Sequence, residues 1–211
     1  MRLAKPLLER VFSVRPLNRV LCWRAARSGN AVAVTFDDGP SPSCTPAVLD
    51  ILGKAGAKGT FFLDGMRVAG NPEVVRRIVE EGHEAANHGF GHRTVEFRAQ
   101  TVDCSRALAD SGIRTRLFRP PRVAPRVSDL AWLWFHGYRT VLFSVDTHDS
   151  MRHEGKWSGD APDYAAVSEG DIVLMHDDNP VCVAELPVLL DSLERRGLRC
   201  VTVSELLGAR R

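Results

Sequence analysis

Short apolar runs alternate along the chain with stretches of helical periodicity. Helices are predicted where apolar positions recur three or four residues apart, at 45–56, 72–81, 97–110, 127–136 and 183–196. Strands are predicted from β-branched or apolar runs at 31–36, 59–63, 83–87, 115–118, 139–145, 171–175 and 199–203. Strands that alternate with helices are typical of βα units around a parallel sheet. Seven such units predict an α/β fold, an imperfect barrel.

Length and composition favour one domain. The chain has 211 residues, of which 44% are hydrophobic, enough to bury a full core. The formal net charge is +2, but residues 1–30 carry +6, so residues 31–211 carry −4. An acidic balance in the body argues against nucleic acid as a partner. We therefore divide the chain into a basic arm (1–30), a main domain (31–207), which the residues discussed below make the candidate catalytic domain, and a short tail (208–211).

The arm permits two interpretations. Charges interrupt its apolar stretches before a signal peptide or a membrane span could form, so no export signal is recognised and a cytoplasmic location is expected. One interpretation is peripheral contact with an anionic membrane at the inner face, through Leu7, Val11, Leu17 and Leu21. The other is a short helix packed under the domain, which Pro6 and Pro16 favour because they break the amphipathic period.

The cysteines give no sign of a structural framework. Five are scattered along the chain without a Cys-x-x-Cys spacing, so neither a disulfide scaffold nor a thiolate zinc site is predicted. Free thiols agree with a reducing compartment. The sequence offers no prediction of oligomeric state.

Polar residues follow five of the predicted strands. In chain order they are Asp37 with Asp38, His88 with His92, Arg119, Asp149 and His176. Because chemistry in barrels takes place at the carboxyl ends of the strands, these groups are expected to meet at one rim. Residues 146–163, a long segment without periodicity that begins at such a strand end, are expected to contribute to the same site.

These residue types indicate metal-assisted hydrolysis. His88 and His92 have the spacing of a two-histidine metal site, and one carboxylate of the aspartate pair would complete the three protein ligands typical of catalytic zinc. A dication would also offset the repulsion between the two aspartates. The other aspartate is then free to act as a base on water, whose pKa the metal lowers. His176 is the candidate acid for the leaving group, kept protonated by Asp149.

With these residues assembled, the sequence resembles the polysaccharide deacetylase family, metal-dependent hydrolases that remove acetyl groups from amino-sugar polymers. The resemblance runs from about residue 31 to 207. It is carried by "TFDDGPSPSCTP" (35–46), "GHEAANHGFGH" (82–92), "FRPP" (118–121), part of the family's fourth motif in "DTHDS" (146–150), and "LMH" (174–176). It implies a distorted (β/α) barrel with seven or eight strands in a single domain.

The resemblance also implies a role for each site residue. Asp37 would be the general base, oriented by Arg119, and His176 the general acid, tuned by Asp149. Asp38, His88 and His92 would bind the metal, most often zinc and in some members cobalt or nickel. Leu174 would line the pocket for the acetyl methyl group. Beyond what the resemblance implies, we take Pro121, Arg122 and Trp157 as further candidate substrate contacts.

Two motif positions depart from the family pattern. Arg122 replaces an aromatic residue after the prolines, and we hypothesise that it faces an anionic part of the substrate, such as a diphosphate or uronate. Ser150 stands where a tryptophan normally forms a wall of the acetyl pocket. We expect Trp157, seven residues later, to fold back and replace it.

Three functions follow from these observations. The first is an N-deacetylase of amino-sugar glycans. The second keeps the hydrolysis but moves it to an acetamide or formamide on a lipid-linked sugar at the inner membrane face, which the basic arm favours. The third is a non-catalytic glycan-binding relic of the same fold, which the two altered motif positions suggest.

Overall fold

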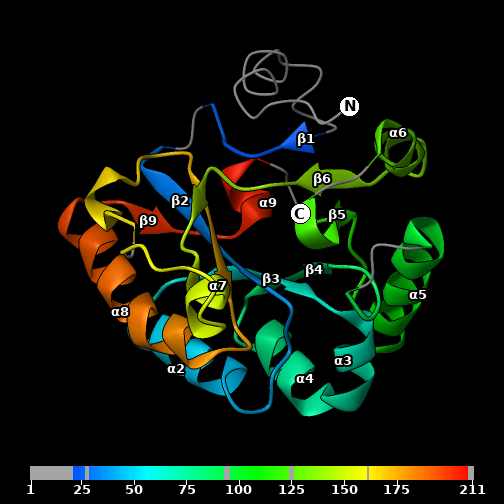
Figure 1. Cartoon of the computed structure of the whole chain (residues 1–211), viewed down its shortest axis with the longest axis horizontal. Helices are drawn as coiled ribbons and strands as arrows, with labels where there is room; N and C mark the ends of the chain where they lie inside the picture. Colours follow the sequence, from blue (N-terminus) through cyan, green and yellow to red (C-terminus); the bar gives the residue numbers. More distant parts are fainter. Residues whose placement is uncertain (1–20, 27–28, 93–95, 124–125, 161, 209–211) are drawn as a thin grey trace.

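A parallel β-sheet curls through the centre of the molecule, with helices packed around its outer face (Figure 1). The computed structural model describes residues 21–26, 29–92, 96–123, 126–160 and 162–208. Within these ranges the strand order is β1-β6-β5-β4-β3-β2-β8-β7, and β9 pairs with β2. The strands are β1 Leu21–Cys22, β2 Ala31–Asp37, β3 Gly59–Leu63, β4 Glu84–Asn87, β5 Leu117–Phe118, β6 Arg139–Val141, β7 Val145–Asp146, β8 Ile172–His176 and β9 Arg199–Cys200.

The helices cover the outside of this sheet. They are α2 Thr45–Lys54, α3 Gly65–Gly70, α4 Pro72–Glu80, α5 Phe97–Asp110, α6 Val127–Phe135, α7 Asp149–His153, α8 Pro180–Arg195 and α9 Val203–Leu206, with 3₁₀ turns η2 Pro121–Val123 and η3 Tyr164–Ala166. The prediction of an α/β barrel-like domain is confirmed. The ring is a half-barrel, because β6 and β7 follow each other in sequence but do not pair with each other. Among the described helices, none is long and apolar enough to cross a membrane.

The alternation of side chains along β2 explains how the fold builds a polar site on an apolar frame. Val32, Val34 and Phe36 point outward into the main core beneath the helices. The intervening positions face the inside of the curl, where Ala31 and Ala33 pack in a second apolar cluster. Thr35 and Asp37 continue that inner face and are also buried. A carboxylate therefore reaches the inside of the half-barrel at the carboxyl end of its central strand.

The structure corrects three sequence-based predictions of elements. The strand predicted at 139–145 is divided into β6 and β7. The strand predicted at 199–203 ends at Cys200, because the Thr202 side chain accepts a hydrogen bond from the amide of Glu205 and caps α9. The segment 146–163 contains α7, where no helix was predicted.

The final part of the predicted arm belongs to the fold. Leu21, predicted as a membrane contact, is buried, because β1 pairs in parallel with β6 and places Leu21 beside Thr140. That prediction is wrong for Leu21. The other predicted membrane contacts, Leu7, Val11 and Leu17, lie outside the described residues, as does most of the arm.

Candidate active site

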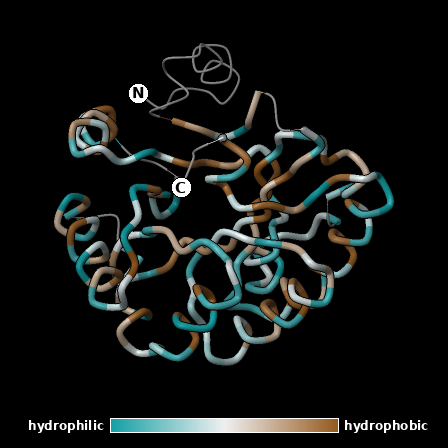
Figure 2. The backbone as a smooth tube through the Cα atoms, turned by 180° about the vertical axis from the view of Figure 1, so that it is seen from behind, coloured by the Kyte–Doolittle hydropathy of each residue, from teal (hydrophilic) through white to brown (hydrophobic). Residues whose placement is uncertain are grey.

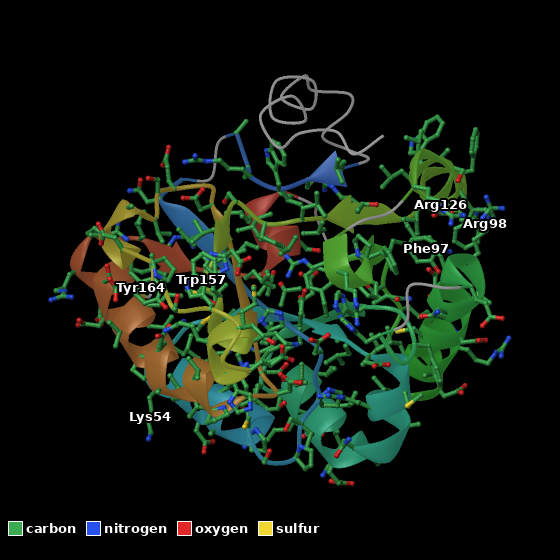
Figure 3. All side chains as sticks on the ribbon, in the orientation of Figure 1. Lys54, Phe97, Arg98, Arg126, Trp157 and Tyr164 are labelled. Carbon is green, nitrogen blue, oxygen red and sulfur yellow. The ribbon has the colours of Figure 1, made fainter. Side chains whose placement is uncertain are left out.

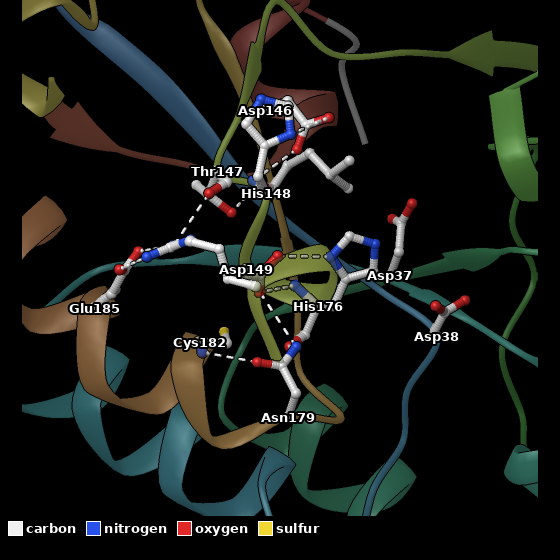
Figure 4. Close-up of polar contacts among 12 residues, drawn as sticks. Asp37, Asp38, Asp146, Thr147, His148, Asp149, His176, Asn179, Cys182 and Glu185 are labelled. Atoms are coloured by element: carbon white, nitrogen blue, oxygen red, sulfur yellow. Dashed lines mark hydrogen bonds and ion pairs between the residues drawn. The ribbon is translucent and has the colours of Figure 1, made fainter. Parts of the chain in front are cut away.

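The polar groups predicted at strand ends meet at one edge of the sheet. Asp37 and His176 are the last residues of the neighbouring strands β2 and β8 and lie side by side in the ladder. His88 directly follows β4, Arg119 directly follows β5, and Asp149 begins α7 just after β7. Figure 4 shows Asp37, Asp38, Asp149 and His176 converging from these elements. All strands involved are parallel, so their carboxyl ends share an edge.

Backbone conformation sends the two adjacent aspartates to different partners. Asp37 is still in the strand and points inward. Asp38 has φ 70°, in the left-handed region that residues other than glycine rarely adopt. This conformation turns its carboxylate toward the histidines. Gly39 follows, and a Cβ at this position would lie 2.3 Å from the carboxylate oxygens of Asp177, so only glycine fits there.

Asp38, His88 and His92 form a group that fits a metal ion. Their candidate ligand atoms all lie within 4.8 Å of one another. Oδ1 of Asp38 lies 3.3 Å from Nε2 of His88 and 3.3 Å from Nε2 of His92, yet it is buried without a hydrogen-bond partner in the described residues. A buried carboxylate oxygen left without such a partner costs free energy. Two imidazoles and one carboxylate are a donor set that suits zinc, and His₂Asp or His₂Glu triads leave a position for water or substrate.

Contacts behind the histidines orient them for this role. Nδ1 of His88 lies 2.9 Å from the carbonyl oxygen of Arg119, which leaves Nε2 free to face Asp38. His92 adopts φ 48° in the turn "HGFGH". The amide of Gly91 in that turn donates to Oδ1 of Asp64 at 2.6 Å. The loop that carries the second histidine is therefore fastened to the end of β3.

Electrostatics keeps Asp38 ionised. Burial raises the pKa of its carboxyl, but the close approach of His88 and the charges of His88 and His92 outweigh burial and hold that pKa well below its usual range. Burial lowers the pKa of His88, yet the neighbouring carboxylates of Asp37 and Asp38 raise it overall. The histidines and the aspartate thus attract one another, and the carboxylate is available as an anionic ligand.

Arg119 holds the other aspartate. Its Nη1 donates to Oδ1 of Asp37 at 2.7 Å and to Oγ1 of Thr35 at 2.8 Å. Its Nε and Nη2 donate to the carbonyl oxygens of Val141 and Leu142 at 3.1 and 3.0 Å. The side chain is completely buried, with its guanidinium 4.1 Å from the ring centroid of Phe62. With one oxygen fixed by Arg119, Asp37 keeps Oδ2 directed toward the histidine site, 3.7 Å from Nε2 of His88.

His176 is paired with a buried carboxylate. Its Nδ1 lies 2.8 Å from Oδ1 of Asp149, and its backbone amide donates to Oδ2 of the same residue at 2.8 Å (Figure 4). Asn179 donates to Oδ2 at 3.3 Å. Burial lowers the pKa of His176, but the hydrogen bond and charge of Asp149 raise it to about 9 overall. The imidazole is therefore protonated at neutral pH, with Nε2 left to donate a proton.

The residues predicted to contact the substrate differ in how closely they approach the site. Leu174 is buried two positions before His176, so it shares the inner face of β8. Pro121 packs against Gly89, between the two histidines. Arg122 is exposed, with φ 58°, and its charge contributes to lowering the pKa of His92, although burial is the main cause.

Trp157 folds back onto the fourth motif. Its ring stacks on His148, with centroids 4.0 Å apart and planes at 21°, and Gly159 packs closely on its indole nitrogen. His148 immediately precedes Asp149. The role of Trp157 as a wall of an acetyl pocket stays a prediction.

Sequence reasoning missed three buried polar residues that support the site. Asp64, at the end of β3, caps α3 and the histidine turn. Asn87, at the end of β4, accepts from the amide of Gly89 at 2.8 Å. Asp177 follows His176 and accepts a short hydrogen bond from the Thr45 hydroxyl behind Gly39. Asp64 and Asn87 could have been found by the same signal that identified the other site residues, which is a polar residue at the end of a predicted strand.

Comparison with known proteins identifies the fold and the motifs together. The family model described as "Polysaccharide deacetylase" matches residues 24–141, more than half of the chain. The chain belongs to the polysaccharide deacetylase family. The expectation of an amide-hydrolysing enzyme that deacetylates amino-sugar glycans is thereby confirmed at the level of the family.

Three relatives of this polysaccharide deacetylase illustrate the match. It is 34% identical over 209 residues to a peptidoglycan-N-acetylglucosamine deacetylase of Bacillus cereus, covering 88% of this chain and 92% of the relative. It is 34% identical to a chitooligosaccharide deacetylase of a Bradyrhizobium strain, covering 79% and 86%. A crystal structure of a peptidoglycan N-acetylglucosamine deacetylase with a bound N-hydroxybenzamide compound superposes with a TM-score of 0.81 at 26% identity, covering 94% and 97%.

Proposed function

We propose that this polysaccharide deacetylase is a metal-dependent N-deacetylase that hydrolyses the acetamide of N-acetylglucosamine units in a glycan, releasing acetate and the free amine. The observation that carries the proposal is the convergence of Asp38, His88 and His92, with an unpartnered buried oxygen of Asp38 at their centre. The relatives named for peptidoglycan and chitooligosaccharides support the substrate class.

Asp38, His88 and His92 would hold the ion. The chemistry of this donor set suits zinc, with cobalt or nickel as substitutes. A divalent metal bound there supplies a Lewis acid that polarises a carbonyl and makes water more acidic. Asp38 brings one negative charge and the two histidines none in their neutral form. The ligand set would thus leave a net positive centre beside Asp37.

Asp37 is the residue best suited to take the proton from the attacking water. It lies next to the metal ligands, and Arg119 fixes its other oxygen, so the free oxygen is oriented before substrate binds. The water oxygen forms a bond to the amide carbon as Asp37 accepts its proton. A pre-oriented base avoids the cost of reorganisation during the reaction.

His176 is the residue best suited to protonate the departing nitrogen. An amine leaves an amide only when it is protonated, and an imidazolium held by Asp149 carries that proton at neutral pH. As the carbon–nitrogen bond breaks, Nε2 of His176 gives its proton to nitrogen. The products are a carboxylic acid and an amine, and transfer of a proton from Asp37 to His176 restores the resting state of both residues.

The specificity proposed for Arg122 rests on its position. It follows Pro121, is exposed, and has no ion pair among the described residues, while its charge is felt at His92. A free guanidinium beside the reactive centre suits a carboxylate or phosphate on the substrate. Arg122→Ala should raise KM for an anionic muropeptide-type glycan far more than for a neutral chitooligosaccharide. An equal change for both substrates would remove Arg122 from this role.

Metal content and acetate release test the function together. The purified chain is analysed for bound metal by elemental analysis beside Asp38→Ala and a matched control, Asp110→Ala, which changes an exposed aspartate at the end of α5. We expect about one metal per chain in the parent and the control, loss in Asp38→Ala, and acetate release from N-acetylglucosamine oligomers that follows metal content. No metal in any protein after zinc is supplied would favour the glycan-binding relic. Metal without acetate release would redirect the search to lipid-linked or formylated sugars.

A further inference from the structure

Helix α6 is apolar on two faces, and the protein covers one of them. Leu133 is fully buried, and Leu130 and Trp132 pack with it against the small core cluster of Phe118 and Tyr138. The helix begins at Val127 and ends at Phe135 and includes one acidic residue and no basic residue. Its position at the edge of the molecule is visible in Figure 2.

The second face of α6 is open. Val127, Ala131, Trp134 and Phe135 fall four, three and one residues apart, which places them on one side of a helix. Val127 is 76% exposed, Trp134 54% and Phe135 77%, and the rings of Trp134 and Phe135 touch, with centroids 4.9 Å apart. The opposite side of the helix is already packed against the protein, so an exposed apolar face of this kind indicates an interaction site. We call these four residues the α6 face.

Positive charge accompanies the α6 face. Arg126 precedes the helix and Arg98 lies beside it, with its guanidinium 5.9 Å from the ring centroid of Trp132 (Figure 3). The one acid of the helix, Asp129, is already occupied, since it accepts from the amide of Arg126 and lies 4.0 Å from Nε of Arg98. Within Val127–Phe135, no other carboxylate is present to repel an anionic surface.

The basic end of the sequence enters the fold next to this helix. Residues 1–20 include five basic residues and one acidic, a net charge of +4, so the other 191 residues carry +2 minus +4, or −2. They lead into β1, which pairs with β6, and β6 is the strand that directly follows α6. Leu21, where residues 1–20 join the described fold, therefore pairs with the strand that follows the aromatic end of α6.

We propose that the α6 face docks on an anionic phospholipid surface. Trp134 and Phe135 would enter the headgroup region, where tryptophan is favoured because its ring is apolar and its N–H finds polar partners. The lipid phosphates would attract Arg98, Arg126 and the basic residues among 1–20, because an anionic bilayer attracts each lysine or arginine near its surface. This arrangement has both contributions that reversible membrane binding requires, apolar area and positive charge.

The direction of the helix determines what such docking does to the site. In a βα unit the helix runs antiparallel to its strands, so the end of α6 that carries Trp134 and Phe135 lies away from the carboxyl ends of β5 and β6. Arg119 and η2 lie at the other end, beside the active site. A lipid surface against the aromatic end of α6 would leave the catalytic edge facing away from the bilayer.

Vesicle co-sedimentation tests the proposal. The full chain is mixed with vesicles of phosphatidylcholine alone or with about one third phosphatidylglycerol, at low and high salt. The variant Trp134→Ser/Phe135→Ser is compared with Met66→Ser/Val188→Ser, which removes two similarly exposed apolar side chains from α3 and α8. We expect the parent and the control to bind phosphatidylglycerol vesicles, with salt weakening binding, and the α6 variant to bind at least tenfold less. Thermal melting within a few degrees of the parent verifies that both variants fold.

Two results would overturn the proposal. One is binding that is equal in the α6 variant and the control, or absent in the parent. The other is evidence that something else occupies the α6 face.

A concentration-dependent dimer that the α6 variant abolishes would assign the face to a second copy. The emission of Trp134, obtained by subtracting the Trp134→Phe spectrum, would be blue-shifted before vesicles are added if residues 1–20 covered it.

Discussion

At the residue scale, two adjacent aspartates differ in role because their backbone conformations differ. Asp37 stays in the strand and is held by Arg119, whereas Asp38 turns through a left-handed conformation to face His88 and His92. A dication between Asp38 and the histidines offsets the repulsion that the aspartate pair would otherwise feel.

This difference predicts opposite effects of two isosteric substitutions. Asp37→Asn should keep bound metal and lower turnover by about 10²-fold or more, because the base is removed while the ligands remain. Asp38→Asn should lower metal content itself, because it removes the anionic ligand. Elemental analysis and acetate release on the same samples measure both. Full activity in Asp37→Asn would show that another group is the base.

The pairing of His176 with Asp149 predicts the alkaline limit of the reaction. Their hydrogen bond raises the pKa of His176 to about 9 in spite of burial, so the acid form persists at neutral pH and is lost as pH rises through about 9. Asp149→Asn removes the charge that favours the imidazolium and should move the falling limb of the rate to lower pH by roughly one to three units. The profile of kcat against pH measures the shift.

A control separates this tuning from simple damage. Asn179→Ala removes a hydrogen bond to Asp149 but leaves both charged groups in place, so its alkaline limb should stay within about half a unit of the parent. If the limb stayed near pH 9 in Asp149→Asn, His176 would not be the titrating acid.

Much of this residue-level pattern could be predicted from the sequence. Asp37, Asp38, His88, Arg119 and His176 each stand at the end of a predicted strand, and parallel topology alone brings such residues together. The division of labour between the aspartates rests on a φ angle that no periodicity encodes. Asp177 was missed because its contact, with Gly39 and Thr45, joins segments 132 or more residues apart in the chain.

At the element scale, the turn after β2 is set by close packing. Gly39 has no room for a side chain, because a Cβ would meet the Asp177 carboxylate, whereas Gly53 in α2 has open space around it. Gly39→Ala should therefore push the Asp38 turn away from its position, lower the melting temperature by several degrees and weaken metal binding at least tenfold.

Gly53→Ala is the matched control for this substitution. It should raise the free energy of unfolding by about 0.5–1 kcal/mol, as alanine does inside an exposed helix, and leave metal affinity unchanged. Thermal melting and metal titration of the two variants measure the contrast. Equal metal affinity in Gly39→Ala and the parent would mean that the turn adapts without cost to the site.

The elements that the sequence predicted well are those with continuous apolar runs. The prediction of β3 at 59–63 and of α5 at 97–110 matches the structure residue for residue. The short elements were not predicted: α7 has five residues and α9 four, too few for a helical period to appear. Their placement depends on tertiary contacts, such as the ion pair and hydrogen bonds that join Arg152 of α7 to Glu185 of α8.

At the scale of the whole molecule, Arg119 connects parts of the sheet that do not pair directly. It donates to Thr35 and Asp37 on β2 and to the carbonyls of Val141 and Leu142 at the end of β6. β6 lies next to β1 at one end of the sheet, and three strands separate it from β2 in the sheet order. The guanidinium spans the inside of the curl.

Arg119→Lys should therefore reduce both stability and activity. A lysine cannot reach four acceptors from one planar group, and hydrogen bonds to charged groups contribute about 1.5–3 kcal/mol each, so a loss of about 3 kcal/mol or more is expected. Arg106→Lys, at an exposed position of α5, is the control and should change the free energy of unfolding by less than about 0.5 kcal/mol. Urea unfolding measures both, and an unchanged midpoint for Arg119→Lys would contradict this role.

Because one buried side chain both joins β2 to the end of β6 and orients the base, we expect that the sheet cannot loosen there while the site stays intact. On heating, catalytic loss and the loss of tertiary structure should follow a single curve, with no inactive folded species between them. A cell that degrades unfolded chains would then remove each molecule at the moment it ceases to work, so the pool that remains would be fully active.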